Sequence, residues 1–180
     1  MASPLSPSRL WLMRAAFLGL ALLIMFFHLI PLETVPRRWT APDLLVAFAF
    51  AWGLRRPEYA PALSIAAAML MADLLFQRPP GLMALLVVLG SEYLKNRAAG
   101  LREASFAGEW LAVCLTLLAI TVLNRLVLGL LAVEQAQLSL SLIQMVMTML
   151  AYPPVVLITQ SVMGVRKLAP SDAEAIGGRA

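Results

Sequence analysis

The chain has 180 residues, of which 61% are hydrophobic and only 13% are charged. Soluble domains are typically about 45–50% apolar and about 25% charged, so this composition excludes an ordinary soluble domain and indicates a protein embedded in a lipid bilayer. A net charge of +4 would also suit a nucleic-acid-binding protein. In membrane proteins, however, Lys and Arg gather in cytoplasmic loops, and we therefore expect no nucleic-acid partner.

Six apolar segments along the chain predict an all-α membrane protein, with six transmembrane helices in one domain of residues 1–167. The helices are expected at residues 10–30, 41–54, 59–76, 81–95, 108–132 and 138–165. The first is too long for the apolar core of a signal peptide, which spans about 7–15 residues, and we predict that it is retained. Residues 168–180 lack an apolar face and are expected to form a disordered cytoplasmic tail.

The second segment, residues 41–54, is short for a membrane span, because crossing a hydrocarbon core of about 30 Å takes about 20 apolar residues. Three interpretations stay open: the helix is extended by Trp39, it uses interfacial residues, or it is partly re-entrant. Its opening, Pro42-Asp43, places proline in the first turn and an acid near the positive end of the helix dipole. The basic corner Arg55-Arg56-Pro57-Glu58 ends the segment.

The third and fourth segments form a hairpin around the turn of residues 76–81. The third carries Asp73 in an otherwise apolar run, and an acid near the centre of a membrane helix costs of order 3 kcal/mol. We therefore expect polar groups or nearby water to compensate this carboxylate. Small residues at four-residue intervals also mark this helix, and because small faces allow close packing we predict that it is central in the bundle. The stripe consists of Ala60, Ser64, Ala68 and Ala72, and a shorter pair, Ala15 and Gly19, lies on the first helix.

The distribution of basic residues predicts the orientation in the membrane. With six spans and a cytoplasmic N-terminus, ten of the 14 Lys and Arg residues lie on the cytoplasmic side, three lie outside, and Arg125 lies within the membrane. The positive-inside rule therefore places both termini in the cytoplasm. If the second segment did not cross, the later helices would invert and the split would worsen, which favours six true spans.

With this topology, polar side chains of several helices fall in the outer half of the bilayer. We predict that they form a cluster with an ion pair between Asp73 and Arg125, since pairing offsets the desolvation of each charge. In the alternative arrangement, Asp73 reaches water beside Arg78 while Arg125 reaches the outer headgroups alone. The expected members of this cluster are His28, Asp73, Arg78, Asn124, Arg125 and Gln144.

Patterns typical of catalysis or metal binding are not found in the sequence. His28 is the only histidine and Cys114 the only cysteine, which leaves no two-histidine metal site and no conventional relay between the two. Ser91 follows Gly90 but lacks the surroundings of a nucleophile elbow, and no glycine-rich phosphate loop occurs. We therefore predict that the protein is not an enzyme and has no catalytic residue, metal or cofactor.

Four short motifs stand out between residues 42 and 95. They are Pro42-Asp43-Leu44-Leu45, Trp52-Gly53-Leu54-Arg55-Arg56-Pro57-Glu58, Asp73-Leu74-Leu75-Phe76 and Pro80-Gly81-Leu82-Met83-Ala84-Leu85. Together they resemble the rod shape-determining MreD family of bacteria. In that family a short second helix opens with Pro-Asp, a basic corner precedes the third helix, and the third helix ends in Asp-Leu-Leu. The turn at residues 76–79 departs from the glycine and small residues common in the family.

The resemblance implies a non-enzymatic scaffold of the bacterial cell-elongation complex, which controls cell shape by organising peptidoglycan synthesis at the cytoplasmic membrane. It implies MreC as the main partner, with MreB, RodA and a class B penicillin-binding transpeptidase as further members of the complex and membrane lipid around it. The implied fold resembles the six-helix substrate-binding components of energy-coupling-factor vitamin transporters. Besides the polar cluster, the candidates for partner binding or structural polar contacts are Pro42, Asp43, Arg55, Arg56, Glu58, Pro80 and Gly81.

The alternative function is that of the vitamin-binding component of such a transporter, with the outer polar cluster holding the ligand. A lid over a ligand needs a long, polar, aromatic loop. The first outer loop, residues 31–40, has only about ten residues. Its length favours the scaffold.

Overall fold

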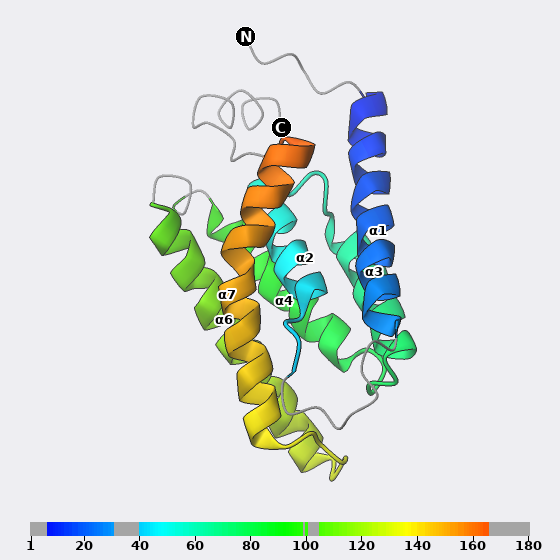
Figure 1. The fold of residues 1–180 in the computed structure, drawn as a ribbon, viewed down its shortest axis with the longest axis vertical. Coiled ribbons are helices and arrows are strands. Elements are labelled where there is room, and N and C mark those ends of the chain that lie inside the picture. Colours follow the sequence, from blue (N-terminus) through cyan, green and yellow to red (C-terminus); the bar gives the residue numbers. More distant parts are fainter. Residues whose placement is uncertain (1–6, 31–39, 99, 101–104, 166–180) are drawn as a thin grey trace.

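A computed structural model describes residues 7–30, 40–98, 100 and 105–165 of the protein. Within these residues the prediction of an all-α fold is confirmed, with six helices and no strand (Figure 1). Each helix begins and ends within three residues of its expected range. The helices are α1 (Pro7–Leu29), α2 (Leu44–Arg55), α3 (Ala62–Leu75), α4 (Leu82–Asn96), α6 (Phe106–Leu130) and α7 (Leu138–Met163).

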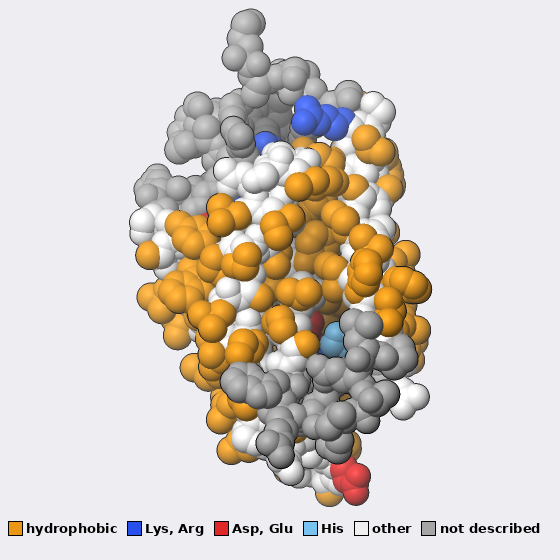
Figure 2. Space-filling view, in the orientation of Figure 1, with side chains coloured by type: hydrophobic (Ala, Val, Ile, Leu, Met, Phe, Trp, Pro, Cys, Tyr) orange, Lys and Arg blue, Asp and Glu red, His pale blue; other side chains and the backbone are white. Residues whose placement is uncertain are grey.

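Three of these helices, α1, α6 and α7, are long and apolar enough to cross a membrane, and α2 and α3 are shorter apolar helices. Large apolar side chains cover the sides of the molecule, and charged side chains gather towards its two ends (Figure 2). This distribution is the one expected of a protein that lies in a membrane. We name the end where α1 begins and α2 and α4 end the basic end (Figure 1). These helix ends carry six of the described Lys and Arg residues: Arg9, Arg14, Arg55, Arg56, Lys95 and Arg97.

Helix α2 occupies the centre of the bundle. Every residue from Leu45 to Arg55 is buried, and the helix packs against α1, α4 and α7 (Figure 1). The prediction that the third helix is central is therefore wrong, since α3 packs mainly on α4 and α1 and exposes Leu63 and Leu74 to 81% and 63%. A stripe of small residues marks a packing face, but it does not decide which helix must be enclosed.

The shortness of α2 explains its place. Its 12 residues span about 18 Å, which is much less than a hydrocarbon core of about 30 Å. Polar groups at the ends of such a helix cannot reach water through lipid, so neighbouring helices must satisfy them. Trp39, which was expected as a possible extension, lies outside the described residues.

The small-residue faces behave differently on α3 and α1. Ala60, Ala68 and Ala72 are buried and Ser64 is half-buried, so the stripe of the third helix faces inward as predicted. Gly19 on α1 is exposed, and a Cβ added there would meet no atom within 4 Å. That face of α1 has no partner within the described part of the chain.

Helix α4 packs closely against its neighbours at Gly90. A Cβ atom placed there would lie 2.9 Å from Thr116 Cγ2 and from Ile120 Cδ1, and 3.3 Å from the ring of Phe50. Because Phe50 is fully buried, it has little room to yield. Gly90 therefore sets how closely α4 packs against α6 and α2.

We expect Gly90→Leu to lower the melting temperature of the detergent-purified protein, because overpacking a dense core typically costs about 1–3 kcal/mol. Gly19→Leu is the matched control and should melt like the wild type, since its new side chain meets open space. Circular dichroism during heating measures both variants. Equal melting temperatures would show that the bundle is not closely packed at Gly90.

Candidate functional site

The buried carboxylate of Asp73 joins α3 to α4. Asp73 is 0% exposed, and its Oδ2 accepts hydrogen bonds from the backbone N–H groups of Gly81 (3.0 Å) and Ala84 (3.1 Å). The first N–H groups of a helix have no partner within the helix, and a negative charge there is favoured by the helix dipole. The φ of +89° at Gly81 allows the turn to bring these groups to the carboxylate, since glycine adopts this conformation without strain.

The predicted ion pair between Asp73 and Arg125 is wrong. Arg125 instead donates through Nη1 to the carbonyl oxygen of Ala136 (3.1 Å) and to Ser141 Oγ (2.8 Å). The alternative, in which Asp73 reaches water, is also wrong because the side chain is fully buried. The start of α4 lies directly across the hairpin, so its N–H groups compensate the acid without a side chain from another helix. The more general prediction, that polar groups compensate the charge of Asp73, is confirmed.

Asp43 and Arg78 form the ion pair that does occur at this end, with 3.2 Å between Asp43 Oδ2 and Arg78 Nη1. Asp43 also caps α2, because its Oδ1 accepts from the backbone N–H of Val46 (3.3 Å). Its own backbone N–H donates to Thr148 Oγ1 of α7 (2.8 Å). Asp43 therefore holds the start of α2 against α7 and against the α3–α4 turn.

A pocket of about 230 Å³ opens at this end, between α6, α7, the start of α2 and the α3–α4 turn. Of the predicted polar cluster, the structure brings four members together at its wall: Arg78, Asn124, Arg125 and Gln144. Asp73 and His28 do not line it, and the ring of His28 packs against that of Phe76, with centroids 4.4 Å apart. Sequence reasoning missed the contribution of Gln135 and Ser141, which come from the turn after α6 and the first turn of α7.

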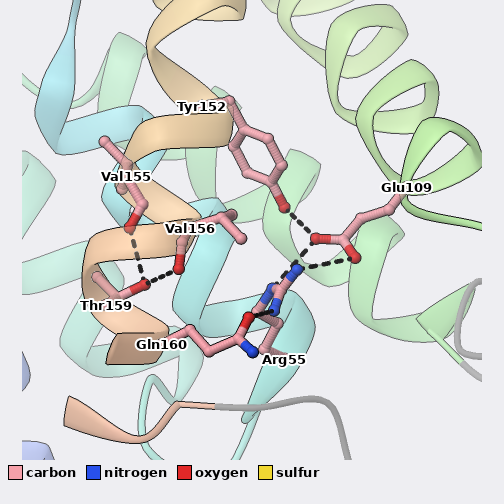
Figure 3. Close-up of polar contacts among 7 residues, drawn as sticks. All are labelled: Arg55, Glu109, Tyr152, Val155, Val156, Thr159 and Gln160. Atoms are coloured by element: carbon pink, nitrogen blue, oxygen red, sulfur yellow. Dashed lines mark hydrogen bonds and ion pairs between the residues drawn. The ribbon is translucent and has the colours of Figure 1, made fainter. Parts of the chain in front are cut away.

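The second polar cluster lies at the basic end, around the buried residues Arg55 and Glu109 (Figure 3). Arg55 binds both carboxylate oxygens of Glu109, at 3.3 and 3.4 Å, and donates to Gln160 Oε1 at 3.2 Å. The hydroxyl of Tyr152 donates to Glu109 Oε1 at 2.7 Å. These contacts join the end of α2 to α6 and α7.

This cluster was only partly foreseen from the sequence. Arg55 was expected as part of a basic corner, whereas Glu109, Tyr152 and Gln160 were not expected to be polar partners. The signal in the sequence was Glu109 itself, an acid in the first turn of an apolar helix. A membrane helix rarely carries an acid without a polar partner. Sequence alone does not indicate that Arg55 faces it, since the two residues are 54 positions apart.

The remaining motif residues lie in turns and at helix ends. Arg56 pairs with Glu58 (3.2 Å), and the carbonyl oxygen of Pro42 accepts from the backbone N–H of Leu44 (3.0 Å). Pro80 is exposed in the α3–α4 turn. Ser91, which was considered as a nucleophile, donates its hydroxyl to the carbonyl oxygen of Val88 in its own helix (2.8 Å). In the described residues, no group of three or more His, Cys, Asp or Glu side chains could hold a metal ion.

Comparison of the chain with protein-family models, with curated proteins and with solved structures found no match. Its function is therefore argued from the motifs and from the contacts described above.

We expect Asp73→Ala to destabilise the detergent-purified protein by about 1–3 kcal/mol, because the backbone N–H groups of Gly81 and Ala84 lose their acceptor. Glu92→Ala is the control, since Glu92 is 43% exposed and its ion pair with Lys95 should contribute at most about 1 kcal/mol. Thermal unfolding in detergent measures both. Normal stability and normal protein level of Asp73→Ala, together with rounded cells, would instead assign Asp73 a direct functional role.

Removing one partner of the buried pair should be more harmful than removing both. Glu109→Leu leaves the charge of Arg55 buried without its carboxylate, which costs about 3–5 kcal/mol. The double variant Arg55→Met, Glu109→Leu should recover part of that loss, because no unpaired charge remains. A double-mutant cycle of unfolding free energies in detergent measures the coupling. Strict additivity of the two single changes would mean that the pair does not act as a unit.

Proposed function

We propose that the protein is a non-enzymatic integral membrane scaffold of the MreD type, which organises the cell-elongation complex of a bacterium by binding other membrane proteins. Its place would be the cytoplasmic membrane, with six spans and both termini in the cytoplasm. MreC would be its main partner, with MreB, RodA and a class B penicillin-binding transpeptidase as further members of the complex.

The proposal rests on the contacts that the motif residues make. Asp43 caps α2 and pairs with Arg78, Arg55 pairs with Glu109, and Asp73 binds the start of α4 through Gly81. Residues of the motifs that resemble the MreD family thus make contacts between helices of this fold. These contacts support an architecture specific to that family, which would present a binding surface to partner proteins.

Helix α1 offers a surface for such a partner. Its buried face is limited to Phe17, Ala21 and Met25, and its remaining residues are exposed or half-buried. Close packing between small faces stabilises helix association in membranes. The exposed Ala15 and Gly19 would allow a partner helix to approach closely there.

The distribution of charge supports the proposed orientation. Six described Lys and Arg residues lie at the basic end, whereas Arg78 and Arg125 lie towards the opposite end. The positive-inside rule then favours the basic end as the cytoplasmic one.

The pocket is the one observation that favours the second candidate, a vitamin-binding component of an energy-coupling-factor transporter. Its volume is about 230 Å³, whereas sites that enclose a drug-sized molecule usually measure about 300–1,000 Å³. We therefore rank this function below the scaffold.

Purification of the tagged full chain from its native membranes tests the proposal. We expect MreC among the recovered proteins. Recovery of a pair of transporter ATPases without MreC would overturn the scaffold in favour of the second candidate.

We further expect Gly19→Leu to lower the recovery of MreC about tenfold, equivalent to about 1.4 kcal/mol, because a bulky side chain would separate the packed helices. Ala119→Leu, on the exposed surface of α6, is the matched control and should leave the recovery unchanged. Quantitative mass spectrometry of the purified complexes measures both variants. An undiminished recovery with Gly19→Leu would exclude this face of α1 as the partner surface.

A further inference from the structure

The pocket between α6, α7 and the start of α2 combines an apolar wall with unused polar groups. We propose that it binds the headgroup of a membrane phospholipid, with Arg125 holding the phosphate and Gln135 accepting a hydrogen bond from an amine or hydroxyl of the headgroup. Binding here is independent of the scaffold function proposed above, because it needs only the chain itself.

Arg125 is the positive charge of the pocket that lacks a compensating acid. Arg78 is paired with Asp43 at 3.2 Å, whereas no carboxylate of a described residue lies within 4 Å of Arg125. Among the described residues, the partners of Arg125 are the carbonyl oxygen of Ala136 and the hydroxyl of Ser141, and both accept from Nη1. These two contacts fix the guanidinium and leave its other nitrogen atoms available. A planar guanidinium matches the oxygen atoms of a phosphate.

Gln135 supplies an acceptor that no protein group uses. Its Nε2 donates to the carbonyl oxygen of Arg125 (3.2 Å), while its Oε1 is buried without a hydrogen-bond partner among the described residues. A buried acceptor left unpaired is unfavourable, so a ligand that donates to it is bound more tightly. The exposed carboxylate of Glu134 also lines the pocket and favours a donor at the same place. Inorganic phosphate has P–OH donors but no apolar part that could contact the wall of the pocket.

The size and the apolar wall favour a lipid as the source of the phosphate. A volume of about 230 Å³ exceeds the roughly 150 Å³ that holds a benzene molecule, and it suits a headgroup better than a whole lipid. Apolar residues line the rest of the pocket, including Leu117, Ile120 and Met145. Outside it, Leu126 and Leu142 are exposed to 63% and 43% and would contact the acyl chains.

Thermal stability of the detergent-purified full chain tests the proposal with four probes: phosphatidylethanolamine, phosphatidylglycerol, phosphatidylcholine and inorganic phosphate. We expect the first two to raise the melting temperature by several degrees, and phosphatidylcholine much less, because its headgroup carries no hydrogen-bond donor. Inorganic phosphate should have little effect. An equal effect of inorganic phosphate would overturn the lipid as the source, and an equal effect of phosphatidylcholine would overturn the role of Gln135.

The variant Arg125→Gln should lose at least half of the shift that phosphatidylethanolamine causes. Arg97→Gln is the matched control at the basic end, where Arg97 packs on the ring of Tyr93 at 4.9 Å, and it should keep the shift. A full shift with Arg125→Gln would overturn the assignment.

Photolabelling of the wild-type chain decides the matter if Arg125→Gln does not fold. Phosphatidylethanolamine with a diazirine in its headgroup should label residues between 117 and 148, and unlabelled phosphatidylethanolamine should compete. Labelling spread over the exposed leucines of all helices, or competition by phosphatidylcholine to the same extent, would overturn the proposal.

Discussion

The short central helix α2 imposes the constraint on which the rest of the structure depends. A helix of about 18 Å inside a membrane bundle leaves both of its ends away from water, where unpaired polar groups cost several kcal/mol each. Asp43 solves this at one end by capping α2 and bonding to Thr148 of α7. At the other end, Glu109 and Gln160 satisfy the buried side chain of Arg55. Polar contacts therefore attach both ends of α2 to neighbouring helices.

A buried charge can also be satisfied by backbone groups in place of an oppositely charged side chain. Asp73 is deeply buried, yet it is held by the first N–H groups of α4, which would otherwise lack partners themselves. Each of these contacts satisfies two needs at once, the charge of a side chain and the end of a helix. Apolar helices alone could pack in many ways. Such contacts favour one arrangement, although only 13% of the residues are charged.

Helix positions could be predicted from the sequence because apolar runs and their breaks are local signals. The compensation of Asp73 by polar groups and the gathering of Arg78, Asn124, Arg125 and Gln144 at one end also followed, since depth along each helix places a residue near one end. Rotation about each helix axis does not follow from depth. For this reason Arg125 was assigned to the wrong partner, and the pair of Arg55 with Glu109 was not foreseen. Which helix becomes central depends on how all ends are satisfied, and that is a property of the whole bundle.

The pocket arises from the same shortness that creates the core. Thr148, which receives the start of α2, is the eleventh residue of α7 and therefore lies about 15 Å along that helix. Beyond this level α6 and α7 continue past the start of α2, and the pocket lies in the space there. Core and pocket are thus two consequences of one helix length, and a change that extended α2 outward would remove the site without disturbing Arg55 or Glu109.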